Sequence, residues 1–477
     1  MQRERNPWGT LAVLALAQFI VVLDVTIVNV ALPRIQTDLE FSPDGLQWVI
    51  SAYTLLFGGF LLLGGRAADL LGSRRVFVIG LVLFGVTSLV AGLAPSPETL
   101  ITARAVQGLG GALLSPAALA ILTKTFSHGR DRNIAMGVWG GLGGLGGTLG
   151  VVAGGLLVDS LSWRWTFFVN VPIVIVLLFL APVLVSHFPR HEGARGGFDI
   201  GGALLSTVGL LGVVYGVVRS EPLGWGSAEV IGSLVVGVVL LVAFVVVEAR
   251  SEAPLVPLRL FQSRALSTAS GALALNGAAF LTMFFLTAIY MQQVLGDSAL
   301  ETGVKLLPMG IAAIVSAVVS TQLVHRFGTR AVQLGALLIA LVGLLLLSRA
   351  GANASYSTDL LPGLILFGIG IIPIGVTAQV SAVADVAHHE AGAASGVVSA
   401  FYQVGGALGL AIATTLAVSS TTHSLAQGAS EHLALVDGFH LGLIVAAVFE
   451  VINIIVTLIS PRLTPTAEQI AEATTGA

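Results

Sequence analysis

Two charged side chains stand inside apolar stretches of the chain, and they are the residues best placed to do chemistry. Asp24 lies in the sequence LDVTIVNVALP at residues 23–33, and Arg104 lies in a second apolar stretch. A charge at the centre of a membrane helix costs roughly 2.5–3.5 kcal/mol on insertion scales, so such a group is usually paired or functional.

The two charges are expected to meet. Each residue of a helix adds a rise of about 1.5 Å. Measured from the expected helix ends at the same membrane face, the depth of Asp24 is roughly 12 Å and that of Arg104 is roughly 9 Å. The resulting ion pair is either a fixed bridge between two helices or a pair that responds to protonation or substrate. We favour the second interpretation, because apolar packing could replace a merely structural bridge at little cost.

The composition places these helices in a membrane. Of the 477 residues, 55% are hydrophobic and only 10% are charged, whereas soluble domains are about 25% charged. The mean hydropathy is +0.95. Cysteine is absent, which excludes disulfides, thiol catalysis and cysteine-ligated metals, and the net charge of −3 gives no indication of nucleic-acid binding.

Fourteen apolar stretches are long enough to be spans, since a membrane-spanning helix needs about 20 residues. They lie at 9–32, 46–65, 76–94, 98–123, 133–158, 163–185, 199–218, 228–248, 266–292, 302–323, 331–348, 359–383, 392–417 and 439–460. With the first residue inside, sixteen Arg and Lys residues fall on the inner side and five on the outer side. Because cytoplasmic loops carry the excess of positive charge, both termini are expected in the cytoplasm. The longest connections are expected at 186–198, 249–265 and 418–438.

The chain also contains a weak internal repeat. The segments at 64–75 and 321–330 both place Gly and Arg in a short inner turn between two spans. Repeated halves are common in transporters. We therefore predict an all-α integral membrane protein with 14 transmembrane helices. Two six-helix bundles (1–185 and 263–462) would flank a linker with two extra helices (186–262), and a cytoplasmic tail (463–477) would follow.

The first inner loop carries a motif with its own chemistry. It reads Gly65-x3-Asp69-x2-Gly72-x-Arg74-Arg75. Gly72 permits a tight turn, and Asp69 can cap a helix or pair with an arginine. Here the chain resembles the major facilitator superfamily, whose signature in this loop is G-x3-D-x2-G-R-[KR], although Ser73 replaces the usual Arg. The resemblance implies a gating latch between the two halves with Asp69 and Arg74 or Arg75 as its charges; the alternative is a positively charged inner turn.

Further segments resemble the fourteen-span drug:proton antiporter branch of this superfamily. The pattern R-x2-Q-G-x-G occurs at 104–110, WRW-x-F-x2-N-x-P occurs at 163–172, and residues 23–33 match the branch's first-helix signature. In span 5, glycines recur at 146, 150 and 154, a spacing that lets helices approach closely. The antiporters of this family carry the pattern G-P-x2-G-G in this helix. Residues 150–155 match it except that Val151 replaces the proline, so a proline kink is not expected here.

The resemblance implies that spans 1, 4, 9 and 12 line a central cavity. In span 9, Asn276, Phe280 and Phe284 recur every four residues and share one helical face. Aromatic side chains with a few amides suit a lipophilic substrate, cationic or neutral. Core packing is the alternative for such residues. The candidate cavity residues are Asn29, Tyr53, Gln107, Asn276, Phe280, Phe284, Tyr290 and Gln379.

Two other polar groups call for an interpretation. Glu450 lies near the middle of the last span with Asn453 close by, and we favour a helix-packing hydrogen bond with a neutral Glu450 over a role in transport. His388, His389 and Glu390 are adjacent in an inner loop, where three consecutive side chains cannot easily face one ion. No metal site is therefore predicted.

The sequence thus predicts a proton-coupled antiporter that exports a lipophilic drug or antibiotic, with Asp24 and Arg104 as the coupling pair. The alternatives are a same-fold exporter of an endogenous metabolite and, in another class, a membrane sensor or scaffold that transports nothing. The sequence has no nucleotide-binding loop, nucleophile elbow or zinc-binding helix, so we expect no enzyme activity, catalytic residue, metal or other cofactor. The expected partners are the substrate, protons and the lipid of a bacterial cytoplasmic membrane, without nucleic acid, and the expected functional unit is a monomer.

Overall fold

The computed structural model describes residues 6–126, 129–185, 199–251, 254–384, 386 and 391–461, and these residues form helices without a strand. Their order is α1 (Pro7–Asp38), α2 (Pro43–Leu46), α3 (Trp48–Leu71), α4 (Ser73–Gly92), α5 (Pro97–Thr125), α6 (Gly129–Ser160), α7 (Trp165–Phe168), α8 (Asn170–Leu184), α9 (Ile200–Leu223), α10 (Ala228–Arg250), α11 (Arg264–Gln293), α12 (Ala299–Phe327), α13 (Thr329–Leu347), α14 (Leu361–Ala384), α15 (Ala391–Ala426) and α16 (Glu431–Ile459). A 3₁₀ turn (Leu258–Gln262) precedes α11, and a π turn (Tyr356–Leu360) precedes α14.

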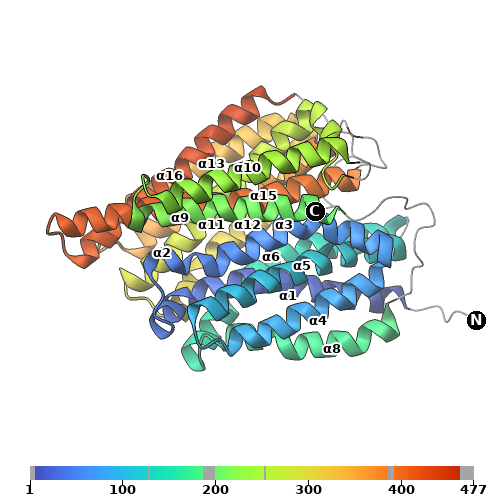
Figure 1. The fold of residues 1–477 in the computed structure, drawn as a ribbon, viewed down its shortest axis with the longest axis horizontal. Coiled ribbons are helices and arrows are strands. Elements are labelled where there is room, and N and C mark those ends of the chain that lie inside the picture. The colour runs from blue at the N-terminus through green and yellow to red at the C-terminus, as the bar shows by residue number, and fades with distance from the viewer. Residues whose placement is uncertain are drawn as a thin grey trace, which may run out of the picture.

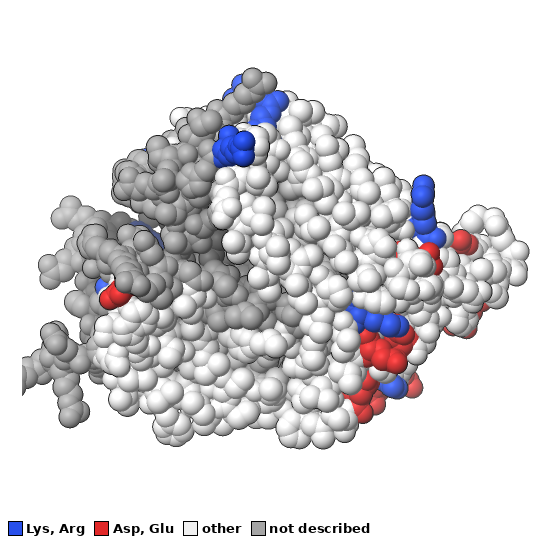
Figure 2. Space-filling view, turned by 180° about the vertical axis from the view of Figure 1, so that it is seen from behind, with Lys and Arg blue, Asp and Glu red and all other residues white. Residues whose placement is uncertain are grey.

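The lengths and composition of these helices make a membrane fold. Within the described residues, 13 helices are long and apolar enough to cross a bilayer, with α7 and α8 counted together, and the 32-residue α6 is a further long helix. Figure 2 shows that charged side chains gather at the two ends of the molecule and leave a broad uncharged middle. The prediction of an all-α membrane protein with fourteen long helices is confirmed.

One predicted connection is wrong. Residues 418–438 were expected to join two spans, but α15 continues to Ala426 and α16 already begins at Glu431. Hydropathy detects the apolar part of a helix, whereas two helices that pack on each other can extend together beyond the lipid. In Figure 1 these ends form a helical hairpin that projects past the other helices on the left.

The helices pack in two groups. In the first, α3 and α4 pack on α5, α1 packs on α6, and α8 packs on α4 and α1. In the second, α11 packs on α15 and α16, while α14 packs on α12 and α13. Helices α9 and α10 pack on each other, and α9 lies against α3 and α15 from the two groups (Figure 1). The predicted residue limits of the two bundles and the linker remain a prediction.

Two glycines close equivalent turns in the two groups. Gly72 joins α3 to α4 with φ of 93°, and Gly328 joins α12 to α13 with φ of 77°. Only glycine adopts such angles without strain. Both turns belong to the repeat segments found in the sequence, so the repeat has a structural counterpart.

Candidate functional site

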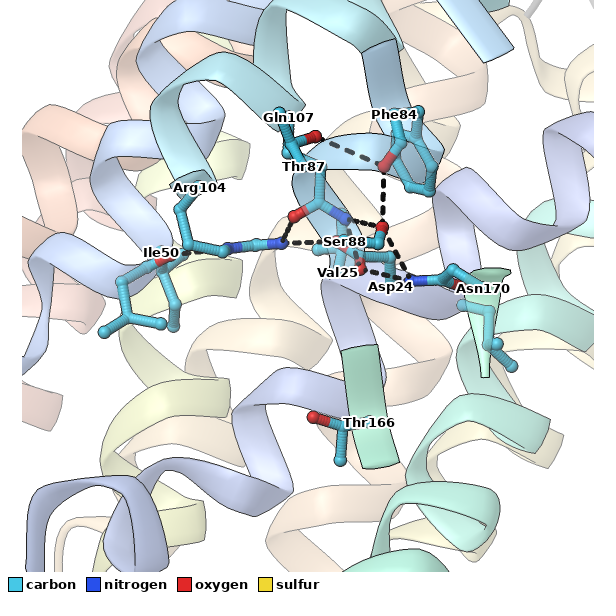
Figure 3. Close-up of polar contacts among 12 residues, drawn as sticks. Asp24, Val25, Ile50, Phe84, Thr87, Ser88, Arg104, Gln107, Thr166 and Asn170 are labelled. Atoms are coloured by element: carbon cyan, nitrogen blue, oxygen red, sulfur yellow. Dashed lines mark hydrogen bonds and ion pairs between the residues drawn. The ribbon is translucent and has the colours of Figure 1, made fainter. Parts of the chain in front are cut away.

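Asp24 and Arg104 form an ion pair inside the first group of helices, as their expected depths indicated. Nη1 of Arg104 on α5 donates to Oδ2 of Asp24 on α1 (Figure 3). The side chain of Asp24 is 0% exposed and that of Arg104 is 1% exposed. Each charge therefore depends on its protein neighbours to replace the water it has lost.

Asp24 receives two more hydrogen bonds, both at its other oxygen. Nε2 of Gln107 and Nδ2 of Asn170 each donate to Oδ1 at 2.8 Å. Gln107 lies one turn from Arg104 on α5, and Asn170 opens α8. Three donors from two helices, α5 and α8, thus reach a single carboxyl group on α1, a set that suits its ionised form.

Arg104 makes further hydrogen bonds and aromatic contacts besides its ion pair with Asp24. Its Nε donates to the Val49 carbonyl at 2.9 Å, and Nη1 also donates to Oε1 of Gln107 at 2.8 Å. The ring of Tyr53 lies 4.3 Å from the guanidinium carbon, and the ring of Phe167 lies 5.8 Å from it. The guanidinium is thus fixed by oriented acceptors and by aromatic faces, which a lysine could not satisfy in the same way.

A serine on α4 completes the network. Ser88 accepts from Nε2 of Gln107 at 2.9 Å and donates to the Phe84 carbonyl at 2.7 Å (Figure 3). Ser88 and Asn170 were not assigned to the site from the sequence. Asn170 belongs to the WRW-x-F-x2-N-x-P cluster, and its place as a polar residue near the start of a span could have indicated a role in the site. No feature of the sequence around Ser88 indicated such a role.

Asn29 takes no part in the contacts of Asp24. Its Nδ2 donates to the Val25 carbonyl one turn back at 2.7 Å, and its Oδ1 has no hydrogen bond among the described residues. Residues five apart on a helix point about 140° apart, which accounts for the separation. The two residues therefore have different surroundings, as their spacing predicted.

The other candidate cavity residues have different surroundings. Gln107 and Tyr53 belong to the surroundings of Arg104. Phe280 and Phe284 stack at 5.7 Å, and Asn276, one turn earlier, is 3% exposed with no partner for Oδ1 among the described residues. A role in substrate binding stays a prediction for all of them.

Two of these candidates lie apart from the rest. The Tyr290 ring stacks on Phe439 at 4.2 Å, and its hydroxyl donates to the Gly351 carbonyl at 2.6 Å. Tyr290 also lines a cavity of about 90 Å³ between α11, α15 and α16, with Gln36 of α1 and Leu46 of α2 in its wall. Gln379 is half-buried and makes long contacts, of 3.4 Å, with Ser395 and Ser399.

The loop motif is partly described. Arg74 donates to the Pro182 carbonyl at 3.0 Å, Arg75 is exposed, and Gly65 faces Pro116. Lys124 donates to Ser73, the residue that replaces arginine in the motif, at 3.2 Å. The Asp69 side chain and residues 388–390 lie outside the described residues. The gating role of Gly65, Asp69, Gly72, Arg74 and Arg75 stays a prediction.

The family model of the Major Facilitator Superfamily matches residues 14–410. The chain belongs to this superfamily. Its members are transporters.

Curated relatives cover most of the chain. The puromycin resistance protein pur8 of Streptomyces alboniger is 42% identical over 95% of this chain and 90% of its own length. The cephamycin export protein CmcT of Amycolatopsis lactamdurans is 39% identical over 87% of this chain and 86% of its own length. The tetracenomycin C resistance and export protein of Streptomyces glaucescens is 34% identical over 87% of this chain and 76% of its own length.

Solved structures share the fold. A mutant of the nucleoside transporter NupG has a TM-score of 0.69, at 12% identity, over 95% of this chain and 99% of that chain. An auto-inhibited peptide transporter of the POT family has a TM-score of 0.66, at 14% identity, over 94% of this chain and 96% of that chain. At such low identity the likeness concerns the fold alone.

Proposed function

We propose that this chain is a proton-coupled exporter of a lipophilic small molecule, such as an antibiotic or another drug. The observation that carries the proposal is the fully buried Asp24, whose donors come from α5 and α8. The relatives named for puromycin resistance and cephamycin export support the direction of transport and the class of substrate. Membership of a transporter superfamily argues against a sensor or scaffold.

The donors around Asp24 provide the coupling. A protonated carboxyl group needs an acceptor for its O–H, but Arg104, Gln107 and Asn170 all present N–H donors. The present arrangement and a protonated Asp24 therefore exclude each other. Protonation favours a different arrangement of α1, α5 and α8, and a proton gradient can thereby bias the conformation.

Alternating access follows from this coupling. In the conformation open to the cytoplasm, Asp24 gives up its proton to the cytoplasm and pairs with Arg104 while substrate enters between the two groups of helices. In the conformation open to the outside, Asp24 takes up a proton from there and the substrate leaves. One proton and one substrate then use the same rearrangement in opposite directions.

We further propose that the protein works as a monomer in the bacterial cytoplasmic membrane with both termini in the cytoplasm. The orientation is supported by the excess of Arg and Lys in the connections on one side. Cysteines introduced one at a time into the connections, and tested with a membrane-impermeant thiol reagent, would report the side of each, because the chain has no cysteine of its own.

The decisive test is the Asp24→Asn variant in everted membrane vesicles. We expect proton-driven drug uptake to fall at least about tenfold, because the amide cannot exchange a proton, a loss equivalent to about 1.4 kcal/mol of coupling. Glu431→Gln, which changes an exposed carboxylate at the start of α16, is the matched control and should transport normally. Unchanged uptake by Asp24→Asn at normal abundance would exclude Asp24 as the coupling group.

A panel of toxic compounds on a sensitive host, with and without a protonophore, identifies the substrate class. Protection that disappears with the protonophore supports a drug exporter. Protection against none of the compounds would favour the alternative, an exporter of an endogenous metabolite.

A further inference from the structure

Glu450 is a second buried carboxyl group, and the export proposal makes no use of it. It lies on α16, its side chain is 0% exposed, and neither of its carboxyl oxygens accepts a hydrogen bond from a described residue. An ionised carboxylate at such a place needs donors or a cation in exchange for the water it has lost.

The cations of the surrounding helices lie far from Glu450. α16 packs against α11, α13 and α15. Arg264 on α11 donates to the Ile459 carbonyl, and Arg330 on α13 donates to the carbonyls of Leu458 and Ser460. These carbonyls follow Glu450 by eight residues or more, which is roughly 12 Å along the helix.

The remaining titratable groups on these helices supply no counter-charge at this depth. His423 on α15 bonds to Gln427, near the opposite end of the bundle. Glu431, His432, Asp437 and His440 lie in the first three turns of α16. Tyr290 and Tyr402 are neutral phenols on α11 and α15.

Asn453 follows Glu450 by three residues, so the two side chains are neighbours, one turn apart, on the same face of α16. Its Nδ2 donates to the Ala272 carbonyl on α11 at 3.1 Å, which fixes the orientation of the amide. Its Oδ1 is buried and has no hydrogen bond among the described residues. Ionised Glu450 and Oδ1 of Asn453 would thus both be acceptors that lack a donor.

We propose that Glu450 is protonated in this conformation and that its O–H group donates a hydrogen bond to Oδ1 of Asn453. Hydrogen bonds then run from neutral Glu450 to Asn453 and from Asn453 to the Ala272 carbonyl, and they connect α16 to α11. This is a second proton-binding site, in the other group of helices from Asp24, and it keeps its proton while Asp24 exchanges its own. The protonation of Glu450 does not depend on the export proposal. The statement that Glu450 keeps this proton through the transport cycle rests on that proposal.

Infrared difference spectroscopy of the full chain in lipid tests the protonation directly. The spectrum of the wild type minus that of Glu450→Gln at neutral pH should contain the C=O stretch of a neutral carboxylic acid. The same difference for Glu431→Gln should contain carboxylate bands, because that side chain is exposed. Carboxylate bands in the Glu450 difference would overturn the proposal.

Transport and stability measurements test the hydrogen-bond chain and the retained proton. Glu450→Gln should keep the wild-type melting temperature and rate of proton-driven uptake, since its amide N–H replaces the O–H toward Asn453. Glu450→Leu should lower the melting temperature because it leaves Oδ1 of Asn453 without a donor, and the added Asn453→Leu change should recover part of that loss. A folded Glu450→Gln variant that loses proton-driven uptake would overturn the proposal that Glu450 keeps its proton during transport. Absence of such uptake in the wild type would instead overturn the export proposal and leave the infrared result standing.

Discussion

At the scale of single residues, the two buried carboxyl groups differ in what surrounds them. Asp24 faces N–H donors from Arg104, Gln107 and Asn170. Glu450 accepts no hydrogen bond from a described residue. Under the two proposals made above, the same functional group is ionised among donors in one group of helices and neutral in the other.

Arg104→Lys should abolish coupled transport although it keeps the positive charge. The guanidinium bonds to Asp24, Gln107 and the Val49 carbonyl at once, and an ammonium group on a shorter reach cannot do so. We expect at least about a tenfold loss of uptake, and a lower melting temperature because buried acceptors lose their donor at about 1–3 kcal/mol each. Uptake per molecule in vesicles and thermal unfolding measure the two effects.

The double variant Asp24→Asn/Arg104→Gln separates stability from function. Removal of one charge leaves the other buried and unpaired at a cost of about 3–5 kcal/mol, whereas removal of both avoids that cost. The double variant should therefore unfold at a higher temperature than Arg104→Gln alone and still not couple transport to protons. Recovery of coupled transport in the double variant would show that the pair is a static bridge.

The sequence predicted the central residues of this network, Asp24, Arg104 and Gln107, but not the residues around them. Asp24 and Arg104 are charges at matching depths in apolar stretches, and Gln107 follows Arg104 by one turn. Asn170 and Ser88 are reached only through the packing of α8 and α4 on α1 and α5, which depends on tertiary contacts. The orientation of the Tyr53 ring toward Arg104 depends on the same contacts.

At the scale of elements, α6 and α12 join the two groups of helices by a close crossing. A Cβ atom on Gly303 would lie 2.6 Å from the Val151 carbonyl oxygen, and one on Gly155 would lie 2.5 Å from Cα of Leu300. Beyond the crossing, Asp159 on α6 accepts from the Leu300 N–H in the first turn of α12 at 2.8 Å. Small residues and one helix cap thus hold the two groups together here.

Gly303→Val should disturb this crossing. The added side chain meets backbone on α6, so the helices must separate, at about 1–3 kcal/mol for an overpacked contact. We expect weaker closure between α6 and α12 and slower transport, measured by uptake and by the distance between spin labels on the two helices. Gly335→Ala on α13, where a Cβ meets nothing within 4 Å, is the control and should be neutral. Equal behaviour of the two variants would contradict a tight crossing.

The elements themselves were largely predictable. Most expected spans end within a few residues of the observed helices, because apolar length and charged connections are read directly from the sequence. The extension of α15 and α16 was missed because those turns are polar and gain stability from each other. The spacing of glycines in α6 predicted a close approach, but not that Gly155 would face α12.

At the scale of the whole molecule, described polar contacts between the two groups of helices lie toward the end of the bundle where α1 finishes at Asp38. Gln292 donates to the Val30 carbonyl at 3.1 Å, Gln293 donates to Gln36 at 2.8 Å, and Thr414 donates to Gln47. With the topology proposed above, this end faces the outside. Alternating access requires that these contacts break when the substrate is released there.

Covalent linkage across this end should therefore stop transport. The chain has no cysteine, so the pair Gln36→Cys and Gln293→Cys can be joined by a short, reducible thiol cross-linker without any change elsewhere. The two wild-type amides are in hydrogen-bond contact at 2.8 Å, so a short reagent can span the positions in this conformation. We expect uptake to fall to background after cross-linking and to return on reduction, while each single variant treated in the same way transports normally. Transport that continued through the cross-linked protein would mean that this end does not open during the cycle, and the alternating-access proposal would fail with it.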